Sequence, residues 1–198
     1  MELHGSPTSP YVRFCRVAAM ARGLELPLTP ANPYEDEGLR RLNPLGRVPA
    51  MRLEDGLALT DSGAIVRHLD ERGDAPSLYT RGGLARHETD AHACLAMGVL
   101  DLGVAWFMEA NKRPEAERSP AWQERRLTGM RAGLAAMGAV AAGLPDDAGA
   151  ADLAFAVCCD WLAFRMPQVD WRVHAGLAAR VDARLALPAF AATDPRAA

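Results

Sequence analysis

Residues 43–51 constrain the fold of this chain more than any other stretch. They read Asn-Pro-Leu-Gly-Arg-Val-Pro-Ala-Met. Two prolines and a glycine interrupt the chain just before an apolar run that begins at Ala50, so the pattern predicts a loop that leads into a strand. Pro49 lacks an N–H and suits the first position of an edge strand or a turn. Val48, β-branched and followed by proline, is expected to be extended.

The main chain of Val48 is a candidate docking point for a peptide. In an extended residue the N–H and C=O point sideways, where an added peptide can pair with them as a neighbouring strand would. A cis Val48–Pro49 bond would fix this presentation, because cis bonds are essentially confined to proline. The sequence leaves the isomer open.

A hairpin and a helix follow this loop. Glu-Asp-Gly at residues 54–56 predicts a turn between strands at 50–53 and 57–59. Asp61 and Ser62 then open a run with apolar residues at helical spacing. The start of a helix gathers free N–H groups and a positive dipole end, which suit a carboxylate. The sequence therefore predicts two adjacent binding sites: the main chain of Val48 for a peptide backbone, and the helix start at Asp61 and Ser62 for a carboxylate.

The order of elements predicts two domains. An α/β thioredoxin-like N-terminal domain (βαβαββα) is expected at residues 1–77, then a linker at 78–83, then an all-α C-terminal helical-bundle domain at 84–198, where alanine, leucine and methionine replace alternating β-branched runs. The other predicted strands lie at 2–4 and 26–29, and the other predicted helices at 10–22, 35–42, 84–111, 120–143, 152–164 and 171–187.

Ser9 lies at the start of the first predicted helix, directly before Pro10. It is either an N-cap that contributes about 1 kcal/mol to the helix, or a hydroxyl that stabilises a substrate thiolate together with the free N–H groups of the helix. Stabilisation of the thiolate is needed because an unperturbed thiol has a pKa of about 8.5 and is therefore mostly protonated at neutral pH. Ser6 and Thr8 are the competing hydroxyls in the same turn. Arg13, one turn into the helix, is either structural or a source of positive potential near Ser9.

These stretches together resemble the cytosolic glutathione S-transferase superfamily, in its bacterial form with a serine-type active site. The resemblance covers the whole chain and is strongest at residues 43–63. It implies that Val48 and Pro49 pair with the cysteinyl backbone of glutathione, that Asp61 and Ser62 bind its γ-glutamyl end, and that Ser9 activates its thiol. Arg47 either reaches the glycyl carboxylate or is an exposed loop arginine.

The resemblance also implies a function. A glutathione transferase activates glutathione, its co-substrate, for attack on a small hydrophobic electrophile, a reaction of detoxification. The electrophile would enter between the two domains, with Tyr11, Trp106 and Met108 as candidate pocket residues. A homodimer is expected because a partner subunit often completes the site in this family. The alternatives are a glutathione-dependent isomerase or disulfide reductase on the same fold, and a non-catalytic module that binds glutathione or another ligand.

One departure from the family concerns the helix predicted to begin near Asp152. Family members have Ser or Thr three residues before this aspartate, as a capping box, whereas this chain has Gly149. Glycine is tolerated at a cap, so a loss of only a few tenths of a kcal/mol is expected. Asp152 could still accept hydrogen bonds from backbone N–H groups.

Composition narrows the remaining possibilities. The chain has 198 residues, is 49% hydrophobic and 24% charged, and carries a net charge of −3, which gives no reason to expect nucleic-acid or membrane attachment. No leader is recognised and no apolar run approaches the roughly 18 residues of a membrane span, so a cytoplasmic protein is expected. The four cysteines form no C-x-x-C pair and are expected to be reduced and buried. No metal site is expected.

Overall fold

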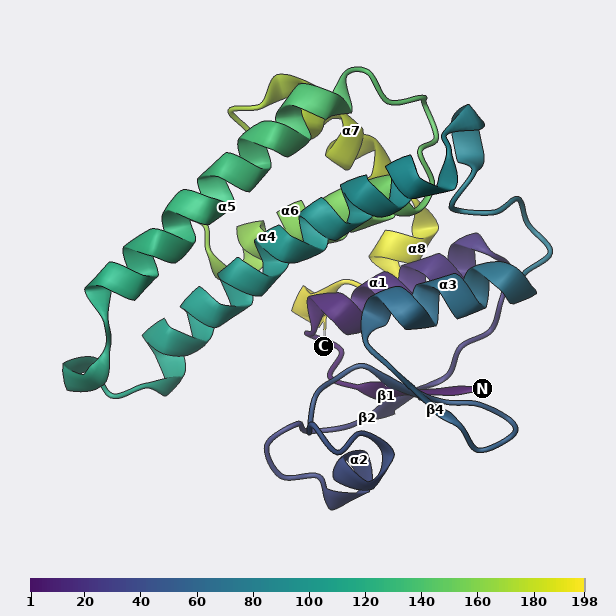
Figure 1. The fold of residues 1–198 in the computed structure, drawn as a ribbon, viewed down its shortest axis with the longest axis horizontal. Helices are drawn as coiled ribbons and strands as arrows, with labels where there is room; N and C mark the ends of the chain where they lie inside the picture. Colours follow the sequence, from purple (N-terminus) through teal and green to yellow (C-terminus); the bar gives the residue numbers. More distant parts are fainter. Residues whose placement is uncertain (198) are drawn as a thin grey trace. The chain divides into compact units, whose positions relative to one another are not determined.

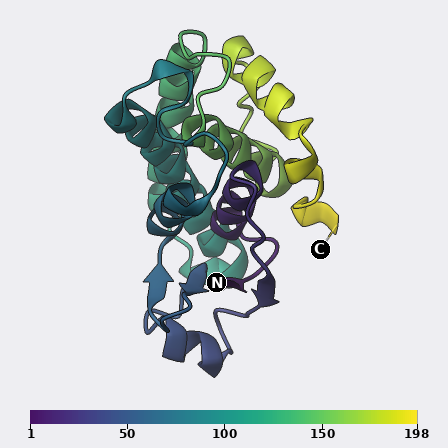
Figure 2. The ribbon, with the colours of Figure 1, turned by 90° about the vertical axis from the view of Figure 1, so that its right-hand side faces the viewer.

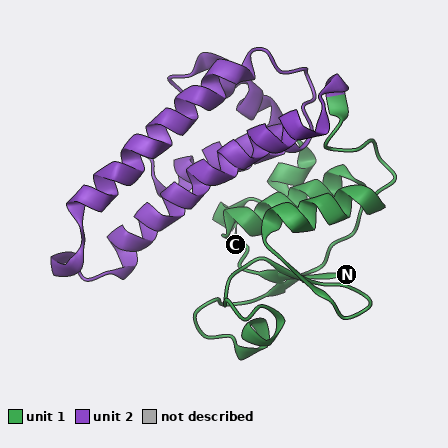
Figure 3. Ribbon diagram, in the orientation of Figure 1, with its two compact units in different colours: residues 1–81, 186–198 green, residues 82–185 purple. Residues whose placement is uncertain are grey.

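The computed structural model describes residues 1–197. The chain divides into two compact units, one of residues 1–81 with 186–198 and one of residues 82–185 (Figure 3). The sequence grouped everything from residue 84 onward, whereas contacts join the last stretch to the first unit. Whether residues 1–77 and 84–198 behave as separate domains stays a prediction.

The sheet of the first unit has four strands within the described residues, in the order β2-β1-β3-β4 (Figure 1). β1 pairs in parallel with β2, and the β1–β3 and β3–β4 pairs are antiparallel. The predicted thioredoxin-like arrangement is therefore confirmed. The bounds of the strands are Glu2–Gly5 for β1, Leu28–Pro30 for β2, Ala50–Arg52 for β3 and Ala58–Thr60 for β4.

The second strand begins later than predicted. The sequence placed it at 26–29, but Leu3 of β1 faces Leu28, and Gly5 faces Pro30. Pro30 fits there because β2 is an edge strand, and the missing N–H of a proline costs no ladder bond on the open side.

Helices α1 (Pro10–Ala21) and α3 (Ser62–Arg72) pack against each other along one face of the sheet, and α2 (Glu37–Leu42) lies by the opposite side (Figure 1). Ser9 caps α1 and Pro10 occupies its first turn, as predicted. The layer between sheet and helices is apolar. Its fully buried side chains include Leu3, Phe14, Met51, Ile65 and Leu69.

The end of the chain returns to α1. Short helices α8 (Pro188–Ala191) and η3 (Pro195–Ala197) form the C-terminal segment, which lies beside α1 (Figure 2). Arg13, only 4% exposed, donates from Nε to Thr193 Oγ1 at 3.2 Å and from Nη2 to the Phe190 carbonyl at 3.1 Å, and its guanidinium lies 5.2 Å from the Phe190 ring centroid. Arg13 therefore has the structural role that the sequence left open.

The second unit is helical. Its longer helices are α4 (Arg86–Lys112), α5 (Pro120–Ala141), α6 (Ala150–Arg165) and α7 (Ala175–Leu185), with one-turn helices η1 (Arg81–Gly83) and η2 (Glu115–Glu117) before α4 and α5. α4 packs against α5 and α6, and α7 packs against α6 and α5. Residues 150–162 of α6 are all buried, and all of them except Asp152 and Asp160 are apolar, as expected for a helix at the centre of its unit.

The last long helix begins later than predicted. The sequence placed it at 171–187, but residues 171–174 form a turn before Ala175. Asp170 explains the delay, because its carboxylate accepts the backbone N–H of Arg172 at 3.0 Å and so holds a turn instead of a helix.

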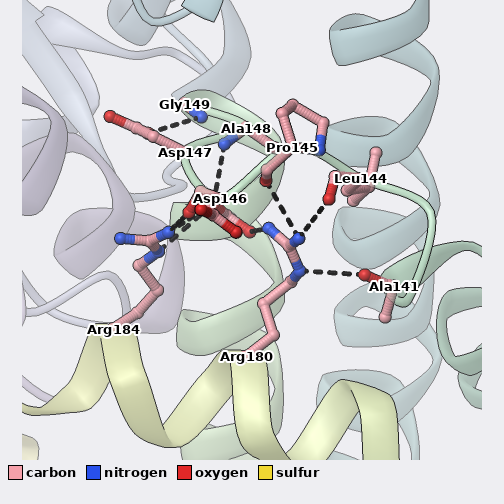
Figure 4. Close-up of polar contacts among 10 residues, drawn as sticks. Ala141, Leu144, Pro145, Asp146, Asp147, Ala148, Gly149, Arg180 and Arg184 are labelled. Atoms are coloured by element: carbon pink, nitrogen blue, oxygen red, sulfur yellow. Dashed lines mark hydrogen bonds and ion pairs between the residues drawn. The ribbon is translucent and has the colours of Figure 1, made fainter. Parts of the chain in front are cut away.

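Asp152 joins α6 to α7 through charge. It is 1% exposed and accepts from Arg180 Nη1 at 2.6 Å and Arg184 Nε at 3.2 Å. Figure 4 shows both arginines reaching from α7 toward the start of α6. It also accepts the Ala148 N–H at 2.8 Å, which confirms that it caps backbone despite Gly149. Arg180 additionally donates to the carbonyl of Ala141, the last residue of α5, and to those of Leu144 and Pro145 in the loop before α6.

α4 is long and apolar enough, by length and composition alone, to cross a membrane, which the sequence reasoning did not anticipate. The core helix of a soluble protein satisfies the same criterion, so a single helix of this kind is weak support for a span. α4 also contributes buried residues to the packing of the second unit, including Ala96, Val99 and Leu100.

Candidate active site

The loop before β3 is organised by Asn43, which is 3% exposed. Its Nδ2 donates to the Arg47 carbonyl at 2.8 Å, and its Oδ1 accepts the Leu45 N–H at 3.1 Å. Gly46 supplies the positive φ of 61° that the turn requires. These bonds hold the chain in one conformation just before Val48 and Pro49.

Val48 presents an open main chain. The Val48–Pro49 bond is cis. Among residues 1–197 neither the N–H nor the C=O of Val48 has a hydrogen-bond partner, although its half-buried side chain packs against the Ala31, Leu39 and Ala50 cluster. Arg47, beside it, is exposed. An extended peptide could therefore pair with Val48 without displacing any bond of the protein.

The start of α3 has an unusual backbone. Asp61 is the N-cap, with φ 64° and ψ 148°, and its carboxylate accepts the Ala64 N–H at 3.0 Å. Non-glycine residues with positive φ are uncommon and gather at binding and catalytic sites. Ser62 follows at the first helical position and is 7% exposed. The N–H groups of this first turn lack helical acceptors and favour an anion.

Ser9 lies at the start of α1, after the end of β1. Its Oγ accepts the Val12 N–H at 3.4 Å, so the capping role is present. No acceptor for its hydroxyl proton lies within bonding distance among the described residues. Ser6 and Thr8 differ, because their hydroxyl oxygens lie 3.0 Å apart and bond each other. One of these two hydroxyls donates to the other, whereas the Ser9 hydroxyl proton is bonded to no described residue.

The candidate pocket residues lie in different units. Tyr11 is on α1, half-buried, in the same unit as Ser9. Trp106 and Met108 are on α4 in the second unit, and both are half-buried. The indole Nε1 of Trp106 is buried with no hydrogen-bond partner among residues 1–197.

The cysteines provide no nucleophile at this site. Cys15 is fully buried, and burial, together with the nearby charge of Asp61, raises the pKa of its thiol well above the usual range. Burial likewise raises the pKa of Cys159. Cys94 is exposed, so the expectation that all four thiols are buried was wrong for this residue. Within residues 1–197 no cluster of three or more His, Cys, Asp or Glu side chains is arranged to hold a metal ion.

Comparison with known proteins identifies the family. Residues 3–77 match the glutathione S-transferase N-terminal domain. The crystal structure of a glutathione S-transferase from Methylobacillus flagellatus, with bound glutathione, is 30% identical and superposes with a TM-score of 0.90 over 97% of this chain and 98% of that one. The chain belongs to the glutathione S-transferase superfamily. Its thioredoxin-like sheet and mostly helical second half are those of this superfamily.

Two curated relatives of this transferase-family chain match over shorter stretches. The GST-like protein YibF of Escherichia coli is 32% identical over 120 residues, which are 60% of this chain and 59% of YibF. The maleylacetoacetate isomerase of Pseudomonas aeruginosa is 38% identical over 77 residues, 36% of either chain. The match thus covers less than two thirds of the length of each of these relatives.

Sequence reasoning missed two residues of this region. Asn43 was read only as part of a turn-forming stretch; the Asn-Pro pair that opens the stretch is the signal for its role in the loop. Arg67 lies one turn into α3, and a Cβ on Gly63 would be 3.6 Å from its Nη2. A cation beside the open N–H groups strengthens the positive potential at this helix start. Gly63 and Arg67 are four residues apart on one helix, so helical spacing is the signal that could have found Arg67.

Proposed function

We propose that this chain is a glutathione transferase of the serine type. The open main chain of Val48 carries the proposal, because a short peptide that pairs with it satisfies two backbone groups that no residue of 1–197 pairs with. The central residue of glutathione would pair there. Its γ-glutamyl carboxylate would bind at Asp61 and Ser62, and its glycyl carboxylate would face Arg47.

The thiol of glutathione would be activated at Ser9. A hydroxyl that donates a hydrogen bond, together with a helix N-terminus, favours the charged thiolate over the neutral thiol. A pKa lowered by about 2 units corresponds to roughly 2.7 kcal/mol. The thiolate sulfur then attacks the electrophilic carbon, the new C–S bond forms, and the leaving group departs with the electron pair of the broken bond.

The second substrate is proposed to be a small hydrophobic electrophile, such as an aryl halide or an epoxide, contacted by Tyr11, Trp106 and Met108. No metal is required, because the thiolate is itself a strong nucleophile at neutral pH once its pKa is lowered.

Substitution of Ser9 tests activation of the thiol, and substitution of Ser62 tests binding of the γ-glutamyl group. In Ser9→Ala the pKa of the thiol of bound glutathione, read from thiolate absorbance across a pH series, is expected to rise by about 2 units to about 8.5, and kcat at pH 7 to fall roughly 25-fold with the thiolate fraction, with little change in glutathione affinity. Thr8→Ala is the matched control and should keep the parental thiol pKa. Unchanged turnover in Ser9→Ala would transfer the activating role to Thr8 or Ser6.

Ser62→Ala is expected to show the opposite pattern. Loss of a hydrogen bond to a charged group costs about 1.5–3 kcal/mol, which raises the Kd for glutathione roughly 10- to 100-fold. The thiol pKa in the complex should stay parental. If glutathione bound neither variant nor the parental chain in calorimetry, the docking proposal itself would be wrong.

A glutathione-dependent isomerase is the second candidate, favoured by the match to the maleylacetoacetate isomerase over 77 residues. Parallel assays of maleylacetoacetate isomerisation, aryl-halide conjugation and mixed-disulfide reduction distinguish this candidate, a disulfide reductase and the transferase. A chain that binds glutathione but is inactive in all three assays would be a binding module.

We further propose that the protein acts as a homodimer in the cytoplasm. The dimer follows from the family resemblance. Sedimentation equilibrium at micromolar concentration should give twice the 21.3 kDa mass of one chain. Cell fractionation tests the cytoplasmic location, and recovery with the membrane fraction after a salt wash would contradict it.

A further inference from the structure

Gly5, the last residue of β1, lies against two valine side chains from distant parts of the first unit. A Cβ on Gly5 would lie closer than 3.0 Å to Cγ2 of Val12 on α1, a separation that Cβ atoms in proteins essentially never show. The same Cβ would lie 3.4 Å from Cβ of Val48. The two valines therefore fill the space that a side chain at residue 5 would need.

Both valines belong to parts of the proposed glutathione site. The N–H of Val12 donates to Ser9 Oγ at 3.4 Å, so the first turn of α1 ties the position of Val12 to that of the candidate activating hydroxyl. The main chain of Val48 is the proposed pairing point for the peptide backbone. The two parts of the site thus approach each other across Gly5.

The strand that carries Gly5 is held in place by the sheet. Gly5 faces Pro30 of β2, and its carbonyl accepts the N–H of Ala31 at 3.2 Å. The preceding residue, His4, pairs with Ala50 of β3. A methyl group added at residue 5 would therefore press on the valines instead of moving the strand.

Val12 has little freedom to move aside. Its side chain is fully buried, and a β-branched side chain in a helix is confined to essentially one rotamer. Extra volume in a close-packed interior is accommodated by shifts of the backbone. A methyl group at residue 5 would therefore displace the first turn of α1, which begins directly after Ser9.

We propose that Gly5 is a positioning residue for the glutathione site. The absence of a side chain there lets the start of α1 and Val48 come close enough for one tripeptide to pair with Val48 and place its sulfur at Ser9. This inference rests on the proposed function, and Gly5 acts through the two valines. A misplacement of about 1 Å can lower a catalytic rate by about 100-fold, so a single methyl group is a measurable change.

Gly5→Ala tests the proposal in the full chain. Calorimetry gives the Kd for glutathione, and thiolate absorbance across a pH series gives the pKa of the bound thiol. The Kd is expected to rise at least about tenfold and the thiol pKa to return toward about 8.5, because the thiol no longer lies at Ser9. A parental thiol pKa in Gly5→Ala would overturn the proposal, whatever the Kd.

Gly133→Ala in α5 is the matched control. A Cβ there would also come closer than 3.0 Å to Cγ2 of a valine, Val99, but in the second unit. Both variants should lose thermal stability through overpacking, and only Gly5→Ala should change the thiol pKa. An equal rise of the thiol pKa in Gly133→Ala would show that lost stability, and not positioning, causes the effect.

The double variant Gly5→Ala/Val12→Ala tests the route through Val12, and it decides the question if Gly5→Ala does not fold or binds glutathione too weakly to be saturated. Val12→Ala removes the Cγ2 methyl that the new side chain would meet. The double variant should therefore fold and return the thiol pKa to within about 0.5 unit of the parental value. A double variant that does not fold, or whose thiol pKa stays near 8.5, would overturn the proposal.

The parental chain separates failure of this inference from failure of the proposed function. If the parental chain does not bind glutathione, or binds it without lowering the thiol pKa, the proposed function fails and the role of Gly5 fails with it. If the parental chain lowers the thiol pKa and Gly5→Ala lowers it equally, only the role of Gly5 fails.

Discussion

Asp61 and Gly149 both stand at helix N-termini with positive φ, at 64° and 59°. At Asp61 the hydrogen bond from the Ala64 N–H to the carboxylate offsets part of the strain of this conformation. Asp61 also lies where the γ-glutamyl group is proposed to bind. At Gly149 the backbone has ψ −122°, a conformation open almost only to glycine. Glycine at this position is therefore a backbone requirement, beyond the tolerated cap that the sequence indicated.

Gly149→Ser is expected to destabilise the protein, although serine is a better N-cap in general. The strain of a side chain at this φ and ψ costs about 1–3 kcal/mol, more than the few tenths that a serine cap offers over glycine. Urea unfolding measures the difference. The control is Gly98→Ala in α4, where a Cβ meets nothing within 4 Å and helix propensity predicts a small gain. A stabilised Gly149→Ser protein would contradict the strain.

At the scale of elements, α6 is held at its start by a buried charge cluster. Asp152 satisfies the Ala148 N–H and two arginines of α7 at once. Taking three charges out of water costs several kcal/mol, and their mutual bonds offset this only while all partners are present. The cluster therefore sets where α7 docks on α6 as much as it stabilises either helix.

Asp152→Asn is expected to lower the free energy of unfolding by about 3–5 kcal/mol, because it removes the charge that faces Arg180 and Arg184. Urea denaturation at neutral pH measures the loss. The control is Asp182→Asn, which breaks an exposed pair with Arg172 and should cost at most about 1 kcal/mol. Equal effects of the two substitutions would show that burial of the cluster adds nothing.

At the scale of the whole molecule, the last residues of the chain complete the first unit. Phe190 is 1% exposed, Thr193 2%, and both bind Arg13 on α1, one turn after Ser9. The helix that carries the candidate catalytic hydroxyl is therefore packed on one side by a segment almost the full length of the chain away.

Removal of residues 188–198 is expected to destabilise the protein by at least about 3 kcal/mol, the usual cost of losing one buried phenylalanine, because it also strips Arg13 of its acceptors. Thermal unfolding followed by circular dichroism measures the change. Arg16→Gln, which loses only a 3.4 Å bond to the Ala192 carbonyl at the surface, is the control and should stay near parental stability. If the truncated chain kept the parental stability, the contacts of residues 188–198 with α1 would contribute nothing to the free energy of unfolding.

Much of the first unit follows from local chemistry. Ser9 with Pro10 specifies a helix start, the Asp55-Gly56 turn specifies a hairpin, and Val48-Pro49 specifies an extended residue before a strand, all within a few neighbouring residues. The thioredoxin-like order and the helical second half were predicted on these grounds and are confirmed. The roles of Ser9, Val48, Asp61 and Ser62 toward glutathione stay predictions.

Tertiary structure alone decided what depends on partners distant in sequence. The sequence could not show that Arg13 binds the C-terminal segment, that Cys94 is exposed, or that the guanidinium of Arg165 lies over the rings of Phe107 and Phe164. A local pattern specifies backbone conformation, because turns and caps are satisfied by adjacent atoms. The burial and pairing of a side chain depend on which remote surface the folded chain brings against it.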